Sequence, residues 1–452
     1  MDFISNKDPQ IKEMLSSIGI KNIEELFCDI PATLKLPRPS IDDGLSEYEG
    51  LRHMEKLAAK NSFPSFENYL GAGAYEHHVP ALVNAICSKS EFLTSYTPYQ
   101  AEASQGMLQA IFEYQSAICA LTGMDVANAS VYDGASACAE AALMALRHNK
   151  TRSKILVADS LHPNYKGVVE QYLKNQNGKI ETIKFKNDGS LDLEDFYNKV
   201  DDNTAAVLFQ SPNFFGVVEE LKPFIEFAKS KGVLTIICAN PIAYGLFSSA
   251  GELGADIAVG DCQPLGLSLS FGGPYVGYMA CKQELVRQMP GRIVGETVDT
   301  KNRRGFVLTL QAREQHIRRE KATSNICTNQ ALAALAALVG ILWYGPNGLK
   351  ELALTNYQRS NYLKNHLNNV KGLKVDTTAT TFNEFVLTFE KPLEEVLTIF
   401  RKEGIEPGIE LGRYYPSYKQ SLLVAVTETK NKDQLDRYIN VAKLCASKKG
   451  QL

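Results

Sequence analysis

Five short runs of β-branched and aliphatic residues recur along the middle of the chain at a nearly constant interval. They begin at residues 155, 180, 205, 233 and 257, about 25 residues apart. Helical patterns lie between several of them, at 165–173 and 221–229. A strand about every 25 residues, with helices between the strands, is the spacing typical of right-handed βαβ units. Because the runs are apolar without alternation, we expect strands buried on both faces of a mainly parallel sheet in an α/β protein.

Residues 1–70 are predicted to form a helical arm in front of this sheet. Asp8-Pro9 is a common helix start, and an amphipathic stretch follows at 10–18. Gly19 and several prolines then interrupt the pattern, and a second helical pattern runs from about residue 45 to residue 60. An arm of this kind either wraps a partner subunit or is a plain N-terminal extension, and the sequence leaves both open.

The C-terminal part is predicted to be a smaller α+β domain. A long apolar helix at 331–344 ends at the breaker 345–348. Beyond it, periodicity predicts three helices and two strands, at 352–367, 393–402 and 433–444, and at 384–389 and 421–426. We therefore expect an arm (1–70), a large α/β domain (71–330), and a connecting helix with a small domain (331–452).

Charge and composition exclude several classes of protein. The formal net charge is −3, without the basic excess that is usual for nucleic-acid binders. The longest uncharged apolar stretch, 331–344, is shorter than the roughly 20 residues of a membrane-spanning helix. Residues 1–8 have no apolar core and so do not resemble a secretory signal. The nine cysteines form no CxxC pair, which predicts free thiols in a reducing cytoplasm and no metal site.

The best candidate for an anion cradle is a run of small residues before an alanine-rich helix at 138–146, namely Asp133, Gly134, Ala135 and Ser136. Small residues let backbone N–H groups approach a phosphate, and the helix dipole favours the negative charge. A tight turn explains the same pattern. No Walker loop, dinucleotide fingerprint, G-x-S-x-G elbow or H-E-x-x-H pair is present. His162 follows the first strand, where a site loop belongs, but capping by Asp159 or Ser160 explains that segment too.

A phosphate cradle, a large α/β domain and a small C-terminal domain together suggest a pyridoxal-phosphate enzyme of the aminotransferase-like fold. Such an enzyme needs a phosphate cup, an acid facing the pyridine nitrogen and a Schiff-base lysine. The strand that should end in the acid ends in Asn240, and no lysine occurs between Lys231 and Lys282. The predicted fold is that of a pyridoxal-phosphate enzyme, but the acid and the lysine, two of the three groups that its chemistry needs, are missing.

Several long motifs identify the chain as resembling a known family. They lie at 96–106, 121–135, 212–216, 271–274, 290–295 and 313–330. With these motifs the whole chain resembles the N-terminal (α) subunit of the two-subunit glycine decarboxylase P-protein of the glycine cleavage system. The resemblance implies fold type I and two homologous halves, of which only the β half carries the cofactor lysine. Gln263 then occupies the lysine position, and Asn240 that of the pyridine-facing aspartate.

The resemblance also implies an activity and partners. It implies a cytoplasmic α2β2 complex, glycine dehydrogenase (aminomethyl-transferring), which decarboxylates glycine through pyridoxal phosphate. The aminomethyl group passes to the lipoyl group of the H-protein. The partner, subunit 2, would hold the cofactor covalently, and this chain would complete the partner's active site without a catalytic residue of its own. A purely structural subunit is the alternative; a standalone pyridoxal-phosphate enzyme is disfavoured by the missing lysine.

Each candidate site residue has a structural alternative. Tyr96 and Tyr99 are expected to contact substrate in the partner's site, although tyrosine also packs well at interfaces. His77 and His78 point to opposite faces if the segment is extended, so at most one enters a site. The cradle at 133–136 is interpreted as a relic or shared phosphate cup. The basic segments 303–304 and 313–321 favour subunit contact or lipoyl-protein docking, but such clusters are often solvated faces.

Overall fold

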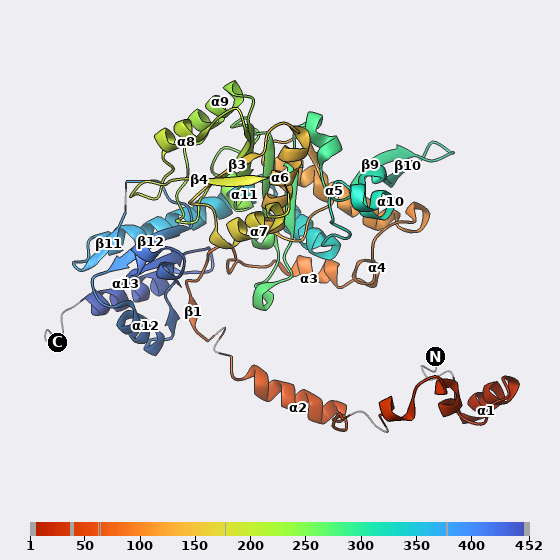
Figure 1. Ribbon diagram of the computed structural model, residues 1–452. Coiled ribbons are helices and arrows are strands. Elements are labelled where there is room, and N and C mark those ends of the chain that lie inside the picture. The colour runs from red at the N-terminus through yellow and green to blue at the C-terminus, as the bar shows by residue number, and fades with distance from the viewer. Residues whose placement is uncertain are drawn as a thin grey trace. The chain divides into compact units, whose positions relative to one another are not determined.

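The computed structural model describes residues 6–36, 40–61, 63, 65–176, 178–376 and 378–446. The chain divides into two compact units, Met1–Phe63 and Pro64–Leu452 (Figure 1). We describe each unit by itself.

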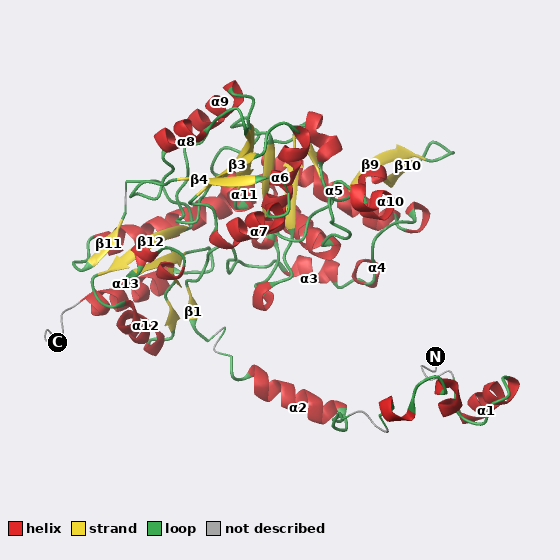
Figure 2. Cartoon of the chain, viewed as in Figure 1, coloured by secondary structure: helices red, strands yellow, loops and turns green. Residues whose placement is uncertain are grey.

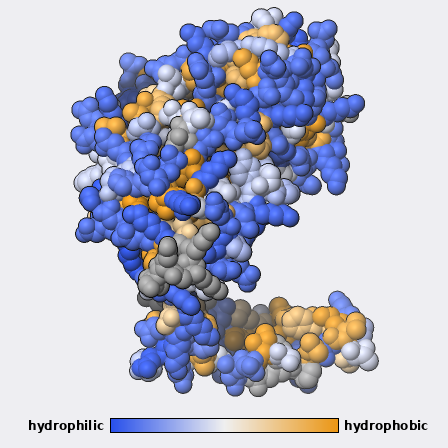
Figure 3. Space-filling view, turned by 90° about the vertical axis from the view of Figure 1, so that its left-hand side faces the viewer, coloured by the Kyte–Doolittle hydropathy of each residue, from blue (hydrophilic) through white to orange (hydrophobic). Residues whose placement is uncertain are grey.

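The N-terminal unit consists of short helices without a core. They are α1 (Asp8–Ser17), the 3-10 turns Ile23–Phe27 and Ala32–Leu34, and α2 (Glu47–Ala58). Both predicted helices are therefore present, and a capping box between Ser46 and Glu49 begins α2. None of the described residues of this unit is buried, and Figure 3 shows apolar side chains open to solvent along the segment.

The second unit is built on a seven-stranded sheet in the order β2-β8-β7-β6-β5-β3-β4. The five predicted strands are all present as β3 (Lys154–Ala158), β4 (Lys179–Ile183), β5 (Thr204–Gln210), β6 (Leu234–Cys238) and β7 (Ile257–Asp261). They are parallel to one another, and β3, β5, β6 and β7 are buried almost throughout. Strand β8 (Gly277–Cys281) and the edge strand β2 (Val126–Ala127) were not predicted. They make the sheet mixed, because β8 runs antiparallel to both of its neighbours.

Helices flank this sheet (Figure 2). Those of the large α/β region are α3 (Ala81–Cys87), α4 (Ser90–Leu93), α5 (Gln105–Thr122), α6 (Gly134–His148), α7 (Pro163–Leu173), α8 (Leu193–Lys199) and α9 (Lys222–Ser230). The alanine-rich α6 is the most deeply buried, since its small side chains let it pack closely against β7 and β8 on one side and α7 on the other.

A long helix, α11 (Ala331–Asn368), connects the large region to the C-terminal region. The breaker predicted at 345–348 is a kink inside this helix, where Gly345 has φ +57° and Pro346 follows. Among the described helices, α11 is the one whose length and composition would allow it to cross a membrane. A core helix passes the same test, and Ala334–Gly340 are buried in the large hydrophobic core.

The C-terminal region has a four-stranded antiparallel sheet in the order β11-β12-β15-β14. Its strands are β11 (Leu373–Val375), β12 (Glu384–Phe389), β14 (Ile409–Glu410) and β15 (Ser421–Ala425). Helices α12 (Leu393–Lys402) and α13 (Lys432–Ala446) share a second hydrophobic core with the end of α11 and this sheet. All the elements predicted for this region are present.

Two further strand pairs bear on the organisation of the chain. β1 (Glu67–Asn68) runs parallel to β13 (Ile405–Glu406), so the residues just before position 70 pack with the C-terminal region. β9 (Ile293–Val298) and β10 (Arg304–Thr309) form an antiparallel hairpin, and the short helix α10 (Gln315–Arg318) follows it (Figure 1). The three-part division with boundaries at residues 70 and 330 stays a prediction.

Candidate functional site

The carboxyl ends of the parallel strands converge with the loop at 71–76 and the N-terminus of α6. Ligands of open α/β sheets bind at this edge. A polar cavity of about 30 Å³ lies here. Its lining includes Tyr75, His162, Tyr165, Asn240, Asp261 and Glu384. The edge predicted to carry the site therefore collects titratable and amide side chains from both sheets of the unit.

Gln263 lies just beyond β7 and is fully buried. Its side-chain oxygen accepts a hydrogen bond from the Tyr75 N–H, and its amide nitrogen donates to the Tyr75 carbonyl, both at 2.9 Å. The same nitrogen donates to the carbonyl of Leu267 at 2.9 Å. The residue at the predicted lysine position therefore joins the strand end to the loop at 71–76.

The N-terminus of α6, the predicted cradle, is occupied by two carboxylates of the chain itself. Asp133 is the N-cap, and its Oδ1 accepts from the Ser136 N–H at 2.7 Å. The carboxylate of Asp261, at the end of β7, accepts from the Gly134 N–H at 3.0 Å. Complete burial raises the pKa of Asp261 to about 7, against the opposing effect of the backbone N–H groups that it accepts from.

His162 and Tyr165 lie side by side between the end of β3 and the start of α6. Their rings are stacked, with centroids 4.7 Å apart. A Cβ added at Gly134 would meet the Tyr165 hydroxyl at 2.6 Å, so the phenol reaches the start of α6. His162 also caps α7, since its Nδ1 accepts from the Asn164 N–H at 3.1 Å. The cap is thus His162, and not Asp159 or Ser160, which the sequence offered as alternatives.

Glu384, at the start of β12, ties the C-terminal sheet to the same loop. One of its oxygens accepts from the Ala72 N–H at 2.7 Å, and the other accepts from the Tyr75 hydroxyl at 2.6 Å. Complete burial raises the pKa of Glu384 to about 7. Tyr75 is thereby held through its backbone by Gln263 and through its hydroxyl by Glu384, which fixes the large region against the C-terminal region.

Asn240 follows β6, at the position predicted for the pyridine-facing acid. Its Oδ1 accepts from the Ile242 N–H at 3.0 Å and caps a 3-10 turn, Pro241–Gly245. Its Nδ2 is buried without a hydrogen-bond partner among the described residues. The side chain therefore lines the cavity as a neutral amide.

The two adjacent histidines behave differently from one another. The His77 side chain is 2% exposed, and its Nδ1 lies 2.8 Å from a carboxylate oxygen of Glu428. The backbone N–H of His78 donates to the other oxygen of Glu428 at 2.7 Å, and His78 itself is exposed. Contact with His77 lowers the pKa of Glu428 against the raising effect of its burial. Neither histidine lines the cavity at the strand ends.

Tyr96 and Tyr99 lie on the surface, apart from the lining of that cavity, with 75% and 51% of their areas exposed. The Tyr99 hydroxyl accepts a hydrogen bond of 2.9 Å from the buried Arg292. The Tyr99 ring meets His316 edge-on, with centroids 5.9 Å apart. Tyr99 therefore belongs to a second, exposed cluster next to the 313–330 motif, and Tyr96 lies three residues before it.

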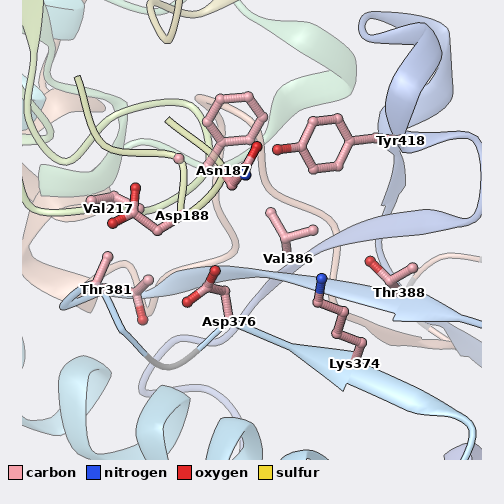
Figure 4. Close-up of a pocket in the computed structure, with 12 residues that line it drawn as sticks. Asn187, Asp188, Val217, Lys374, Asp376, Thr381, Val386, Thr388 and Tyr418 are labelled. Carbon is pink, nitrogen blue, oxygen red and sulfur yellow. The ribbon is translucent and has the colours of Figure 1, made fainter. Parts of the chain in front are cut away.

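The basic segments are partly neutralised by neighbours. Arg303 pairs with Asp299 at 2.7 Å, and Arg304 pairs with Glu296 at 2.8 Å, both on the β9–β10 hairpin. A separate cavity of about 80 Å³ lies between the loop at 187–189 and strands β11 and β12, and it contains none of the predicted site residues (Figure 4). Among the described residues, no group of three histidine, cysteine or acidic side chains has an arrangement that could hold a metal.

Sequence reasoning missed four members of the cavity, namely Tyr75, Tyr165, Asp261 and Glu384. Asp261 carried a usable signal, because it ends a strand at the edge where sites form. Glu384 and Tyr75 carried none, since they come from segments about 310 residues apart that only the fold brings together. Tyr165 could be read only as part of an amphipathic helix.

The sheet order, the kinked connecting helix and the small C-terminal domain define the fold type I class of pyridoxal-phosphate-dependent enzymes. A sphingosine-1-phosphate lyase from Burkholderia pseudomallei has this fold, with a TM-score of 0.66, 13% identity and 92% of this chain covered. The family model of the glycine cleavage system P-protein matches residues 1–442. The chain belongs to the glycine cleavage system P-protein family, which confirms the resemblance.

Relatives match over nearly the full length of the chain. The probable glycine dehydrogenase (decarboxylating) subunit 1 of Protochlamydia amoebophila is 70% identical over 98% of this chain and 99% of its own length. That of Desulforamulus reducens is 50% identical over 96% of this chain and 98% of its own. A crystal structure of an inhibitor-bound glycine decarboxylase (P-protein) has a TM-score of 0.92 and 41% identity, and covers 98% of this chain and 100% of that one.

Proposed function

We propose that this chain is the lysine-free half of a two-chain glycine decarboxylase and that its partner, subunit 2, holds pyridoxal phosphate covalently. The observation that carries the proposal is Gln263. It lies buried at the strand end where the cofactor lysine belongs, and all its side-chain hydrogen-bonding atoms are engaged by Tyr75 and Leu267. No lysine lies between Lys231 and Lys282 to replace it.

The residues of this chain's own pocket do not fit pyridoxal phosphate. The phosphate would have to lie at the start of α6, where Asp261 already accepts the Gly134 N–H that a phosphate would need. The stacked pair His162 and Tyr165 fills the space beside the same helix end. Asn240 offers an amide where the ring nitrogen would need an acid. These features support placing the cofactor on the partner.

When bound in the partner, the cofactor would supply the electron sink that makes loss of CO₂ from glycine possible. This chain's contribution would be to close that site, exclude water and present Tyr96 and Tyr99. The exposure of the two phenols supports this role, because another chain can reach them. We further propose an α2β2 assembly that delivers the aminomethyl group to the lipoyl group of an H-protein. The nine cysteines are free thiols, which supports a cytoplasmic setting.

The test compares the chain alone with the chain paired with its lysine-bearing partner. We expect no Schiff-base absorbance or borohydride-trapped adduct on this chain, and glycine decarboxylation only by the pair. A stoichiometric adduct on the chain alone would overturn the proposal. Tyr96→Ala in the assembled pair separates site closure from scaffolding, since we expect a lower rate with assembly intact. An unchanged rate would favour a purely structural subunit.

A further inference from the structure

Arg292 lies at the centre of the exposed cluster that contains Tyr99. It directly precedes β9, and only 3% of its surface is exposed. Its Nη2 donates to the Tyr99 hydroxyl at 2.9 Å and also to the carbonyl of Cys327. Its guanidinium carbon lies 5.2 Å from the centroid of the Tyr99 ring. A single buried cation therefore fixes both an exposed phenol and the backbone of the 313–330 motif.

The other contacts of Arg292 extend this control along the motif. Its Nε lies 3.8 Å from Glu314, and its Nη1 lies 3.5 Å from the Asn329 side-chain oxygen. Glu314 in turn lies 3.6 Å from the Nδ1 of His316, whose ring meets Tyr99. Arg292 thus links both ends of the motif, Glu314 and Asn329, to Tyr99.

The inner edge of the motif is bound to the loop that leads into α6. The Asn329 amide donates to the carbonyl of Ala129 at 3.1 Å and to the hydroxyl of Ser130 at 3.0 Å. The Cys327 N–H donates to the Tyr132 hydroxyl at 3.3 Å. Figure 1 shows α10, inside the motif, lying beside the β9–β10 hairpin. The motif is therefore a surface segment whose backbone is held from beneath.

Strained backbone borders the same segment. Leu310 and Arg319 have φ of +52° and +53°, and Ser130 beneath them has φ of +132°. A leucine or arginine in this region stores strain that persists only where surrounding contacts enforce it, and such strain gathers at functional sites. In this segment Ile326 packs into the main hydrophobic core, while residues 315–321 are exposed.

The outer face of this segment has the composition of a protein interface. Tyr99 and Ile317 each expose half or more of their surface, and tyrosine and arginine are enriched at interface cores. The face also carries the exposed cations Arg318, Arg319 and Lys321. Since Glu314 is nearly buried against Arg292, Glu320 is the one exposed acid of the 313–321 stretch.

We propose that Arg292 is a positioning residue that holds Tyr99 and the 313–330 motif as a prebuilt wall of the partner subunit's active site. The inference rests on the proposed function, because it requires a lysine-bearing partner. Charge complementarity identifies the partner subunit's active site as what this surface faces. Glycine carries a carboxylate and the cofactor carries a phosphate, so a cationic wall with tyrosines complements the site that binds them. Preorganisation by a buried guanidinium keeps that wall in place before the substrate arrives.

The test uses the complete chain assembled with its cofactor-loaded partner. Arg292→Lys keeps the positive charge but loses the planar guanidinium group that donates to both Tyr99 and Cys327. Tyr99→Phe removes only the hydroxyl group that accepts the hydrogen bond from Arg292. We expect kcat/KM for glycine, per bound cofactor, to fall at least tenfold for Arg292→Lys and threefold or more for Tyr99→Phe. The change in cofactor absorbance on adding glycine should weaken in both, while sedimentation of the complex stays unchanged. Arg413→Lys, whose side chain is 68% exposed in the C-terminal region, is the matched control and should retain wild-type values.

The possible outcomes are distinct. If the wild-type pair neither holds cofactor nor decarboxylates glycine, the proposed function itself fails. If the wild-type pair is active and both variants match it, the inference about Arg292 is wrong. It is equally overturned if the variants raise only the KM for the lipoyl carrier protein, because the motif would then be a carrier-docking surface. If Arg292→Lys does not fold, Tyr99→Phe alone decides.

Discussion

Gln263 and Tyr75 are joined by a pair of hydrogen bonds of 2.9 Å in opposite directions, one donated and one accepted by the same side-chain amide. The amide satisfies both partners, because it carries a donor and an acceptor on one carbon. A lysine here would supply donors alone and leave the Tyr75 N–H unpaired. The side chain of Gln263, at the position proposed for the cofactor lysine, therefore has a structural role.

Gln263→Lys is expected to destabilise the chain without restoring cofactor binding. The variant breaks the pair with Tyr75 and buries an ammonium group, which together cost about 2–5 kcal/mol of unfolding free energy. Urea unfolding measures the loss, and absorbance after incubation with pyridoxal phosphate shows whether an adduct forms. Gln283→Lys, at an exposed position, should change stability by less than about 0.5 kcal/mol. A trapped adduct at residue 263 would contradict the expectation.

Stability is expected to fall as pH rises from about 5 to 7, and Glu384 contributes part of that fall. Its folded pKa of about 7 exceeds that of an unfolded carboxyl, so the folded state binds the proton more tightly. The contribution is complete below the unfolded pKa and is lost as pH rises through 7, at up to about 1.4 kcal/mol per pH unit. Asp261 acts in the same direction.

Glu384→Gln isolates this contribution. A glutamine can still accept from the Ala72 N–H, and its amide can donate to the Tyr75 hydroxyl, so the fold should tolerate it. We would measure urea midpoints at pH 5, 6, 7 and 8. The midpoint of the variant should rise relative to that of the wild-type chain with each step up to about pH 7. Glu351→Gln, at an exposed position of α11, should run parallel to wild type. Parallel curves for Glu384→Gln would show that Glu384 is already ionised below pH 6.

Gly134→Ala should destabilise the chain through a clash with Tyr165. The new Cβ would lie 2.6 Å from the Tyr165 hydroxyl and 3.0 Å from two ring carbons, an overpacking that costs about 1–3 kcal/mol. In a Tyr165→Phe background the hydroxyl is gone, so the same substitution should cost about 1 kcal/mol less. A double-mutant cycle of unfolding free energies measures this coupling. Strictly additive effects would mean that the phenol does not abut the start of α6.

The regular elements could be predicted from the sequence because their signals are local. The runs at 155, 180, 205, 233 and 257 became β3 to β7, since a strand buried on both faces must be apolar throughout. β8 escaped prediction because it pairs antiparallel with β7 and β2 and is not part of the βαβ pattern. The break at 345–348 was located correctly, but α11 continues beyond it, because packing on both sides holds the kinked helix together.

The candidate site was harder to predict than the fold. The assignment of Gln263 and Asn240 to the lysine and aspartate positions stays a prediction, which follows from their places just beyond β7 and β6. Their neighbours in the fold could not be predicted, since Glu384 reaches the strand ends from the other sheet. Likewise Tyr99 was singled out from its motif, but its partner Arg292 lies 193 positions further along the chain. Sequence pattern locates the ends of strands, while side-chain partners across the fold depend on tertiary contacts.

The N-terminal unit offers a last prediction, on where the stable fold begins. A chain that starts at residue 64 should melt within about 2 °C of the full chain, because no described residue before that point is buried. A chain that starts at residue 71 should melt several degrees lower. It lacks β1, which pairs with β13, and Tyr69, which is fully buried against Tyr438 with ring centroids 4.5 Å apart. Calorimetry of the three chains checks both expectations. Equal melting temperatures for the two truncations would instead favour a boundary at residue 70 and make the β1 pairing energetically negligible.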